Sequence, residues 1–281
     1  MATAFYLPKT VKEACALLGE WGERVVITNG GTDIVIEIGK GRLVPEANVC
    51  IRNIEELHAI RQEGEFLSIG GAATFDEMLA SPLVKAFPGM IEAAGVIGSP
   101  AIRAMGTLAG NICTAAPAPD GCTMAMGLDA RVVLRSAAGE RTVPLSEMLL
   151  GRGKTARRGD ELLTQILLPL SKTACAYQRL ARRQAQDIAK VMVGASLETC
   201  GGVITAAAVA LGAVNAVPCR APSVEEMLVG KPAAEGLEAV RDFFPPEAKL
   251  RPSPFREYKQ QVLPTLLFRT LEQAAERGGG R

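Results

Sequence analysis

The stretch Gly98–Asp120 constrains the fold of this chain more than any other feature. It reads GSPAIRAMGTLAGNICTAAPAPD and shows neither helical nor strand periodicity. An irregular stretch of this length inside a compact domain is uncommon unless it has a function. Gly106 and Gly110 let the backbone approach a ligand closely, while Thr107 and Asn111 offer neutral hydrogen bonds. The pattern therefore favours a ligand-binding segment over a solvent-exposed loop.

A second glycine-rich segment, ITNGGTDI, spans residues 27–34. The β-branched run from Arg24 to Thr28 predicts a strand that stops at the two glycines, and a short helix is expected from there to Gly39. Free amides at such a turn suit a pyrophosphate, although a tight turn that needs no ligand is at least as plausible. Neither segment has the Rossmann or P-loop spacing, so a dinucleotide would require a different fold.

The pattern changes near Thr173, where we place a domain boundary between residues 1–173 and 174–281. Before it, short strands alternate with helices and end with a strand at Leu162–Leu168. After it, Ile188–Glu198 and Val203–Val214 predict a hairpin of long strands, and helical patterns follow. The chain is therefore expected to be an α+β protein with two domains.

Composition excludes several classes of function. The formal net charge is +1, from 31 basic and 30 acidic residues, which gives no field for nucleic acid or a membrane surface. The basic stretch Arg152–Arg158 is expected to be a solvated loop. No signal peptide or membrane-spanning run is visible, and seven cysteines without a CxxC pair predict buried thiols in a reducing cytoplasm rather than a metal site. With His58 as the only histidine, most hydrolytic sites are excluded.

Four segments together resemble the FAD-binding subunits of xanthine dehydrogenases, carbon monoxide dehydrogenases and related molybdenum hydroxylases. They are NGGTD at 29–33, IGSPAIRAMGTLAGNICTAAPAPD at 97–120, DELLTQILLPL at 160–170 and AYQRLARRQAQDIAKVMVGASL at 176–197. The resemblance implies a two-part FAD-binding domain of the vanillyl-alcohol-oxidase (PCMH) type in residues 1–173. A smaller α+β C-terminal domain of the carbon monoxide dehydrogenase flavoprotein type, with an antiparallel sheet and helices, is implied in residues 174–281.

The resemblance also implies the cofactor-binding residues. One group wraps the pyrophosphate: Thr28, Asn29, Gly30, Gly31, Thr32, Asp33 and Ile34. A second group contacts the phosphate and ribityl portion, with the last residue on a cofactor hydroxyl: Thr107, Ala109, Gly110, Asn111 and Asp120. Three residues meet the flavin ring, the first through its backbone: Leu163, Ile97 and Ile188. No catalytic residue and no metal ligand are implied.

Two positions depart from the family pattern. Ala109 stands where many relatives have glycine, and its methyl group is tolerable if the residue keeps a negative φ. The family tends to carry a lysine shortly after the aromatic residue at Tyr177; here Arg179 is the preferred candidate, with Gln178 as the alternative. A permanently charged guanidinium near the flavin favours an anionic reduced ring.

By resemblance the chain is an electron-transfer subunit that is not active on substrate alone. Its implied partners are a molybdopterin-binding large subunit and a [2Fe–2S] small subunit, with FAD passing electrons to NAD or another acceptor. The Thr32-Asp33 pair resembles the xanthine dehydrogenase branch of the family more than the carbon monoxide dehydrogenase branch. Two alternatives stay open: a self-contained FAD oxidase or reductase of the same fold, and a non-catalytic nucleotide-binding scaffold. The substrate is not revealed by the sequence.

Overall fold

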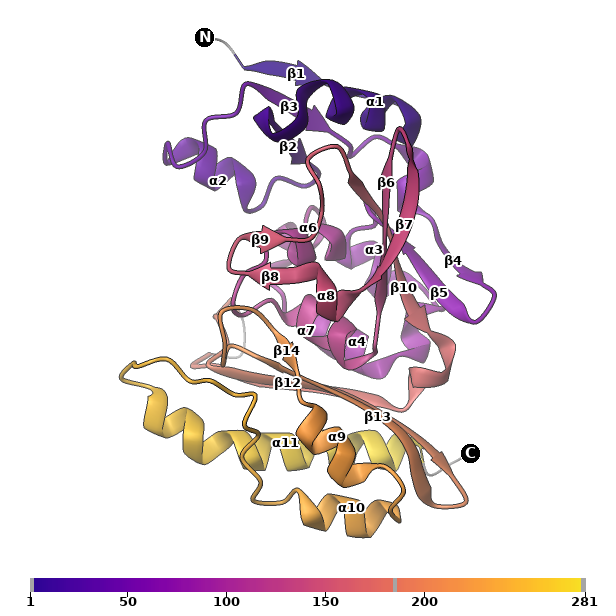
Figure 1. The fold of residues 1–281 in the computed structure, drawn as a ribbon, viewed down its shortest axis with the longest axis vertical. Coiled ribbons are helices and arrows are strands. Elements are labelled where there is room, and N and C mark those ends of the chain that lie inside the picture. The colour runs from indigo at the N-terminus through magenta and orange to yellow at the C-terminus, as the bar shows by residue number, and fades with distance from the viewer. Residues whose placement is uncertain (1–2, 184–185, 279–281) are drawn as a thin grey trace.

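The computed structural model describes residues 3–183 and 186–278. In this part of the chain, three β-sheets follow one another along the long axis, from the indigo N-terminal end to the orange and yellow C-terminal end (Figure 1). A further two-stranded sheet, β8 (Leu149–Gly151) with β9 (Lys154–Thr155), lies beside the middle sheet. The predicted α+β class is confirmed.

The first sheet is parallel and has the order β1-β3-β2. Its elements are β1 (Ala4–Tyr6), α1 (Val11–Trp21), the short 3-10 helix η1 (Gly22–Arg24), β2 (Val25–Thr28), α2 (Ile34–Gly39) and β3 (Ala47–Cys50). Thr10 caps α1 by accepting a hydrogen bond from the backbone N–H of Glu13 at 3.1 Å. The helix continues past Gly19 and ends at Gly22, which has a positive φ of 56°.

The middle sheet is antiparallel, with the order β4-β5-β10-β6-β7 and β10 at its centre. Its strands are β4 (Ile60–Glu63), β5 (Phe66–Gly70), β6 (Arg131–Ser136), β7 (Gly139–Pro144) and β10 (Leu162–Pro169). The helices that accompany it are η2 (Glu55–His58), α3 (Phe75–Ala80), η3 (Val84–Ala86), α4 (Pro88–Gly95), α5 (Pro100–Arg103), α6 (Leu108–Cys113), α7 (Asp120–Gly127), α8 (Leu145–Met148) and η4 (Leu170–Thr173). The stretch from Gly98 to Asp120 thus contains two very short helices joined by loops.

The third sheet is antiparallel, with the order β11-β12-β13-β14. Its strands are β11 (Cys175–Leu180), β12 (Val191–Cys200), β13 (Val203–Gly212) and β14 (Cys219–Arg220), and the helices are α9 (Pro222–Leu228), α10 (Ala233–Ala239) and α11 (Arg256–Gly278). The expected hairpin of long strands is confirmed. Gly201 and Gly202 form its turn with φ values of 58° and 79°.

Glycine lets the middle and third sheets pack closely together. A β-carbon on Gly127 of α7 would lie 2.4 Å from the backbone oxygen of Gly194 in β12, so a larger residue would push the two elements apart. Glu92 of α4 links the same two parts, since it pairs with the guanidinium of Arg277 and accepts a hydrogen bond from the backbone N–H of Tyr177 at 2.9 Å. The third sheet is therefore held firmly to the α4 and α7 side of the middle sheet.

None of the helices within the described ranges combines the length and the apolar character needed to cross a membrane.

Candidate functional site

A cavity of about 610 Å³ lies between the first and middle sheets. Its walls come from β2 and the glycine turn after it, from α6, from the first residues of β10 and from the segment after β8. Ligand pockets usually enclose about 300–1,000 Å³, so this volume suits a large cofactor. Both glycine-rich segments of the sequence therefore face one cavity.

The glycine turn presents unpaired backbone amides to this cavity. The N–H groups of residues 30–33 donate no hydrogen bond to any other residue in the described ranges, and all four residues line the cavity. Gly31 has a φ of 72°, a conformation that glycine adopts without strain. Because these donors have no protein partner and face one cavity, they are free to bind an anionic ligand such as a pyrophosphate.

The two glycine-rich segments touch each other directly. Gly30 packs so closely on Met105 that a β-carbon at residue 30 would lie 1.7 Å from the backbone oxygen of Met105. Beside this contact, Nδ2 of Asn29 donates to the backbone oxygen of Gly71 at 3.0 Å and to Oγ1 of Thr107 at 3.4 Å. Segments far apart in the sequence are thereby fixed into one wall of the cavity.

The start of α6 supplies the next part of the wall. Oγ1 of Thr107 caps the helix by accepting from the backbone N–H of Gly110 at 3.0 Å, and the N–H group of Ala109, which lines the cavity, donates to no other described residue. Ala109 lies in helical conformation and is not among the residues with positive φ, so its methyl group is accommodated without backbone strain. Asn111 lines the cavity and accepts through Oδ1 from the backbone N–H of Cys122 at 2.9 Å.

Other parts of the cavity wall are apolar and suit an aromatic ring system. Ile97, Ile102 and Phe75 lie on the side of the helices, and Leu163 contributes from β10. Gly71 lies so close to β10 that an added β-carbon would be 2.3 Å from the backbone oxygen of Leu163. The cavity thus combines a set of unpaired amides with an apolar surface.

Twelve of the sixteen predicted cofactor residues line this cavity: Asn29, Gly30, Gly31, Thr32, Asp33, Ile34, Ile97, Thr107, Ala109, Gly110, Asn111 and Leu163. Thr28 does not; its side chain is buried and donates to Oδ1 of Asn48 at 2.7 Å. Ile188 also lies outside and is 71% exposed. Asp120 and Arg179 lie outside as well, and they contact each other.

Asp120 and Arg179 form a buried cluster with Tyr177. Oδ1 of Asp120 accepts from the Tyr177 hydroxyl at 2.7 Å and pairs with Nη1 of Arg179 at 3.0 Å. Burial raises the pKa of the Asp120 carboxyl, although the hydrogen bond from Tyr177 and the charge of Arg179 oppose this. Burial and the carboxylate together raise the pKa of Tyr177 well above its usual value. Nη2 of Arg179 is buried and has no hydrogen-bond partner among the described residues.

Sequence reasoning missed several cavity residues, and Arg157 is the most important of them. We expected the basic stretch Arg152–Arg158 to be a solvated loop, but Gly153, Thr155 and Arg157 line the cavity. The expectation holds for Arg152, Lys154 and Arg158, which are exposed, but not for Arg157, because the chain leaves β9 along the cavity and returns to it at Leu162. The basic composition of the stretch does not indicate the path of the backbone. The only feature of the sequence that could have indicated it is the neighbouring strand predicted at Leu162–Leu168.

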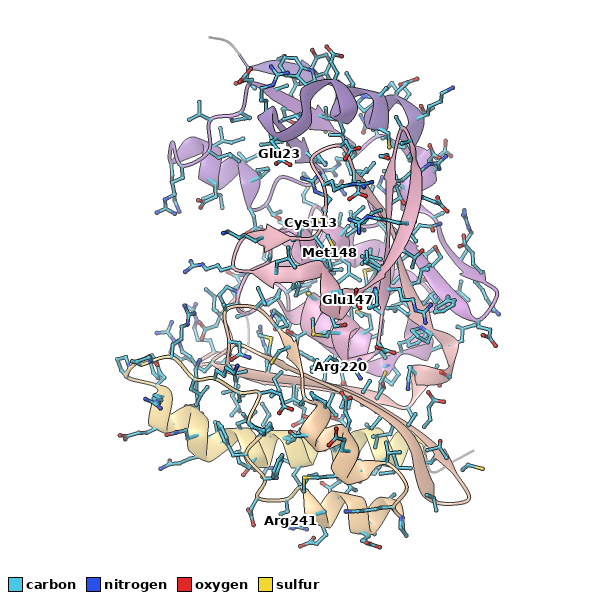
Figure 2. All side chains as sticks on the ribbon, viewed as in Figure 1. Glu23, Cys113, Glu147, Met148, Arg220 and Arg241 are labelled. Carbon is cyan, nitrogen blue, oxygen red and sulfur yellow. The ribbon has the colours of Figure 1, made fainter. Side chains whose placement is uncertain are left out.

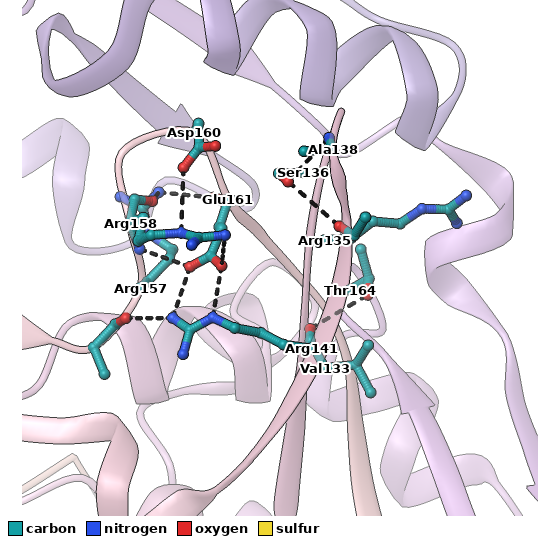
Figure 3. Close-up of polar contacts among 12 residues, drawn as sticks. Val133, Arg135, Ser136, Ala138, Arg141, Arg157, Arg158, Asp160, Glu161 and Thr164 are labelled. Atoms are coloured by element: carbon teal, nitrogen blue, oxygen red, sulfur yellow. Dashed lines mark hydrogen bonds and ion pairs between the residues drawn. The ribbon is translucent and has the colours of Figure 1, made fainter.

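A buried carboxylate holds this segment in place (Figure 3). Glu161 is 1% exposed and accepts from Nε and Nη2 of Arg141 at 2.7 and 2.9 Å. It also accepts from the backbone N–H of Arg158 at 2.8 Å and pairs with the guanidinium of that residue. Although burial by itself raises its pKa, these hydrogen bonds outweigh burial and keep the pKa of Glu161 below the usual range. The residue at the start of β10 therefore anchors the cavity wall before it.

The comparisons with known proteins agree with this geometry. Residues 1–171 match the model of the FAD binding domain in molybdopterin dehydrogenase, and residues 176–274 match that of the CO dehydrogenase flavoprotein C-terminal domain. The nicotinate dehydrogenase FAD-subunit of Eubacterium barkeri is 34% identical over 96% of each chain. The carbon monoxide dehydrogenase medium chain of Afipia carboxidovorans is 32% identical and covers 97% of this chain and 96% of its own.

Solved structures show the same similarity in three dimensions. Carbon monoxide dehydrogenase from Hydrogenophaga pseudoflava, in a form lacking the Mo-pyranopterin moiety of its molybdenum cofactor, matches with a TM-score of 0.88 at 28% identity. The match covers 99% of this chain and 98% of that chain. Quinoline 2-oxidoreductase from Pseudomonas putida 86 has a TM-score of 0.85 at 26% identity, with 99% and 98% coverage.

Proposed function

The chain belongs to the FAD-binding medium subunits of the molybdenum hydroxylase family, and we propose that it is the electron-transfer subunit of such a complex. In this role it stands between a [2Fe–2S] small subunit and NAD or another acceptor. It is an oxidoreductase subunit, and a molybdopterin-binding large subunit would carry the substrate chemistry. The domains proposed are residues 1–173 and 174–281.

The cofactor is FAD. The assignment of its site rests on the group of unpaired amides around the cavity. The N–H groups of residues 30–33 and of Ala109 have no partner among the described residues and lie along a cavity of about 610 Å³. They would hold the pyrophosphate, with Thr107 and Asn111 on the adjoining hydroxyls. Ile97 and Leu163 offer apolar contacts for the ring.

When bound, FAD supplies the redox chemistry, because flavins can exchange electrons singly or in pairs. The chain itself positions the ring, excludes water and sets the local charge. Arg179 would act from the side of the third sheet, where its unpaired Nη2 can donate to the ring or to a ribityl hydroxyl. Asp120 fixes that guanidinium at 3.0 Å. None of these roles requires an acid or a base, which suits a chain with a single histidine.

We further propose that the complex is xanthine dehydrogenase-like and lies in the cytoplasm. Thr32 and Asp33 support the xanthine dehydrogenase branch, and the seven free cysteines support a reducing compartment. The names of the similar proteins as FAD-subunits and medium chains support a multi-subunit assembly. The substrate depends on the large subunit and is left open.

Anaerobic mixing tests the proposed direction of electron flow. The chain loaded with FAD is mixed with a chemically reduced [2Fe–2S] partner subunit, and flavin absorbance is followed; NAD is then added and NADH formation is measured. Loss of flavin absorbance on mixing, and its return with an acceptor, support the proposal. A flavin that stays oxidised beside the reduced partner would contradict it. Turnover by the chain alone with an organic substrate would favour a self-contained flavoenzyme.

A further inference from the structure

Arg157 stands apart from the other residues that line the cavity because of its charge. Asp33 and Glu37 bring acidic groups to the wall, whereas Arg157 is the only lysine, arginine or histidine among the described lining residues. Partial burial and the neighbouring Glu37 raise the pKa of Asp33. A cofactor with a dianionic pyrophosphate would therefore meet one cation on this wall.

The guanidinium of Arg157 is held in a defined place. Nη1 donates to the backbone oxygen of Glu161 at 2.7 Å and to that of Arg158 at 2.9 Å. Nε and Nη2 donate to no residue within the ranges 3–183 and 186–278. Arg141 fixes Glu161 (Figure 3), and Glu161 in turn fixes Nη1 of Arg157. Nη1 is therefore anchored, while Nε and Nη2 keep N–H donors that no described residue uses.

The position of Arg157 relative to α6 is shown by Cys113. This thiol lies at the end of α6 and lines the cavity (labelled in Figure 2). Burial raises its pKa, and the charge of Arg157 is the opposing influence. The backbone N–H of Gly153 donates to the oxygen of Ala115, just after α6, at 3.0 Å, so the segment that carries Arg157 lies beside this helix. The anchored segment also meets the first sheet, since a β-carbon on Gly159 would lie 2.5 Å from Oε1 of Glu23.

We infer that Arg157 is a further cofactor-binding residue, which donates to a phosphate oxygen of the dinucleotide from the segment between β9 and β10. The inference rests on the proposed function and adds a charged contact to its neutral amides. Guanidinium donors that bond to phosphate are stronger than neutral ones. Glu161 is the positioning residue. The backbone oxygens of Arg158 and Glu161 accept from Nη1 of Arg157, and the Glu161 carboxylate holds Arg158 in place by accepting from its backbone N–H.

Flavin titrations of the full chain freed of cofactor test this role. Fluorescence quenching gives the Kd for FAD and for riboflavin, which lacks the pyrophosphate, at low and high salt. R157M should weaken FAD binding about tenfold, as expected for the loss of one hydrogen bond to a charged group. It should leave riboflavin binding unchanged and reduce the salt dependence of FAD binding. R157K should recover part of the affinity.

Two controls separate the possible outcomes. R152M removes the same charge from an exposed residue of the same segment that does not line the cavity, and should bind FAD like the wild type. R157Q keeps neutral donors and replaces R157M if circular dichroism shows that R157M is not folded. Equal FAD affinity in the Arg157 variants and the wild type would overturn the inference, as would equal weakening of FAD and riboflavin. Failure of the wild-type chain to bind FAD would instead sink the proposed function.

Discussion

The side-chain amide of Asn29 lies 3.4 Å from the hydroxyl of Thr107, and this contact joins the two glycine-rich segments. Asn29 follows β2 of the first sheet, while Thr107 caps α6 beside the middle sheet. The same asparagine nitrogen donates to Gly71 at 3.0 Å. The site therefore exists only when both sheets are in place, and its integrity depends on close backbone contacts at their boundary.

Gly30→Ala is expected to disrupt this boundary. The added β-carbon would lie 1.7 Å from the backbone oxygen of Met105, so one of the two segments must move. We predict a strong loss of FAD binding and a lower Tm, because overpacking of this kind costs about 1–3 kcal/mol or more. Gly39→Ala is the matched control, since Gly39 is exposed at the end of α2 with open space around it. Unchanged FAD affinity in Gly30→Ala would contradict the assigned role of the turn.

Glu161→Gln is expected to reduce stability and to alter its pH dependence. The change removes a buried carboxylate that binds Arg141 and Arg158, and should cost roughly 2 kcal/mol in urea unfolding near neutral pH. Because the folded-state pKa of Glu161 is lowered, its contribution is present above the unfolded-state value of about 4.3 and is lost as the pH falls through the folded-state pKa.

The wild-type stability should therefore fall more steeply on acidification than that of Glu161→Gln. Glu140→Gln, at an exposed position of β7, serves as the control and should keep the wild-type curve. Parallel curves for Glu161→Gln and the wild type between neutral and acid pH would contradict this account.

Arg179→Met is expected to leave Asp120 as a buried carboxylate without its cation. Removing one partner of a buried pair costs about 3–5 kcal/mol, and the loss should be partly recovered at lower pH. The sign follows from burial, which already raises the pKa of Asp120; without Arg179 the folded state binds the proton more tightly than the unfolded state. Asp120→Asn in the same chain should restore much of the stability measured by urea unfolding. No recovery in the double variant would show that the pair is not the source of the loss.

Cofactor binding is expected to protect Cys113 from thiol reagents. Cys113 lines the cavity, whereas Cys200 is exposed in the third sheet. Cys175 should stay unreactive in either state, because burial raises its pKa to about 12. Mass spectrometry after timed alkylation should show slower labelling of Cys113 with FAD and unchanged labelling of Cys200. Equal labelling of Cys113 with and without bound FAD would place the cofactor elsewhere.

The elements with strong periodicity could be predicted from the sequence. The strand predicted at Leu162–Leu168 and the hairpin of β12 and β13 appeared in the expected places, because their runs of apolar residues have few alternatives. The short strands β1, β8, β9 and β14 were not predicted, because a segment of two or three residues shows no periodicity. Helix α7 was missed for another reason: all of its residues after Asp120 are buried, so it has no polar face.

Most of the candidate site could be predicted only because of the resemblance. Residue spacing indicated the glycine turn and the Thr107–Asn111 segment, but not that they meet at Gly30 and Met105. The pairing of Asp120 with Arg179 depends on β11 of the third sheet reaching α7, a long-range contact that local pattern does not encode. Their roles towards the cofactor, and that of the exposed Ile188, stay predictions.

The most direct test of the central claim is the flavin content of the purified chain. Its visible spectrum is recorded, the protein is denatured by heat, and the released cofactor is identified and quantified against protein. The account predicts FAD near one equivalent per chain, or uptake of added FAD to that level. A colourless chain that takes up no added FAD would contradict the account and favour a nucleotide-binding scaffold that has lost its cofactor.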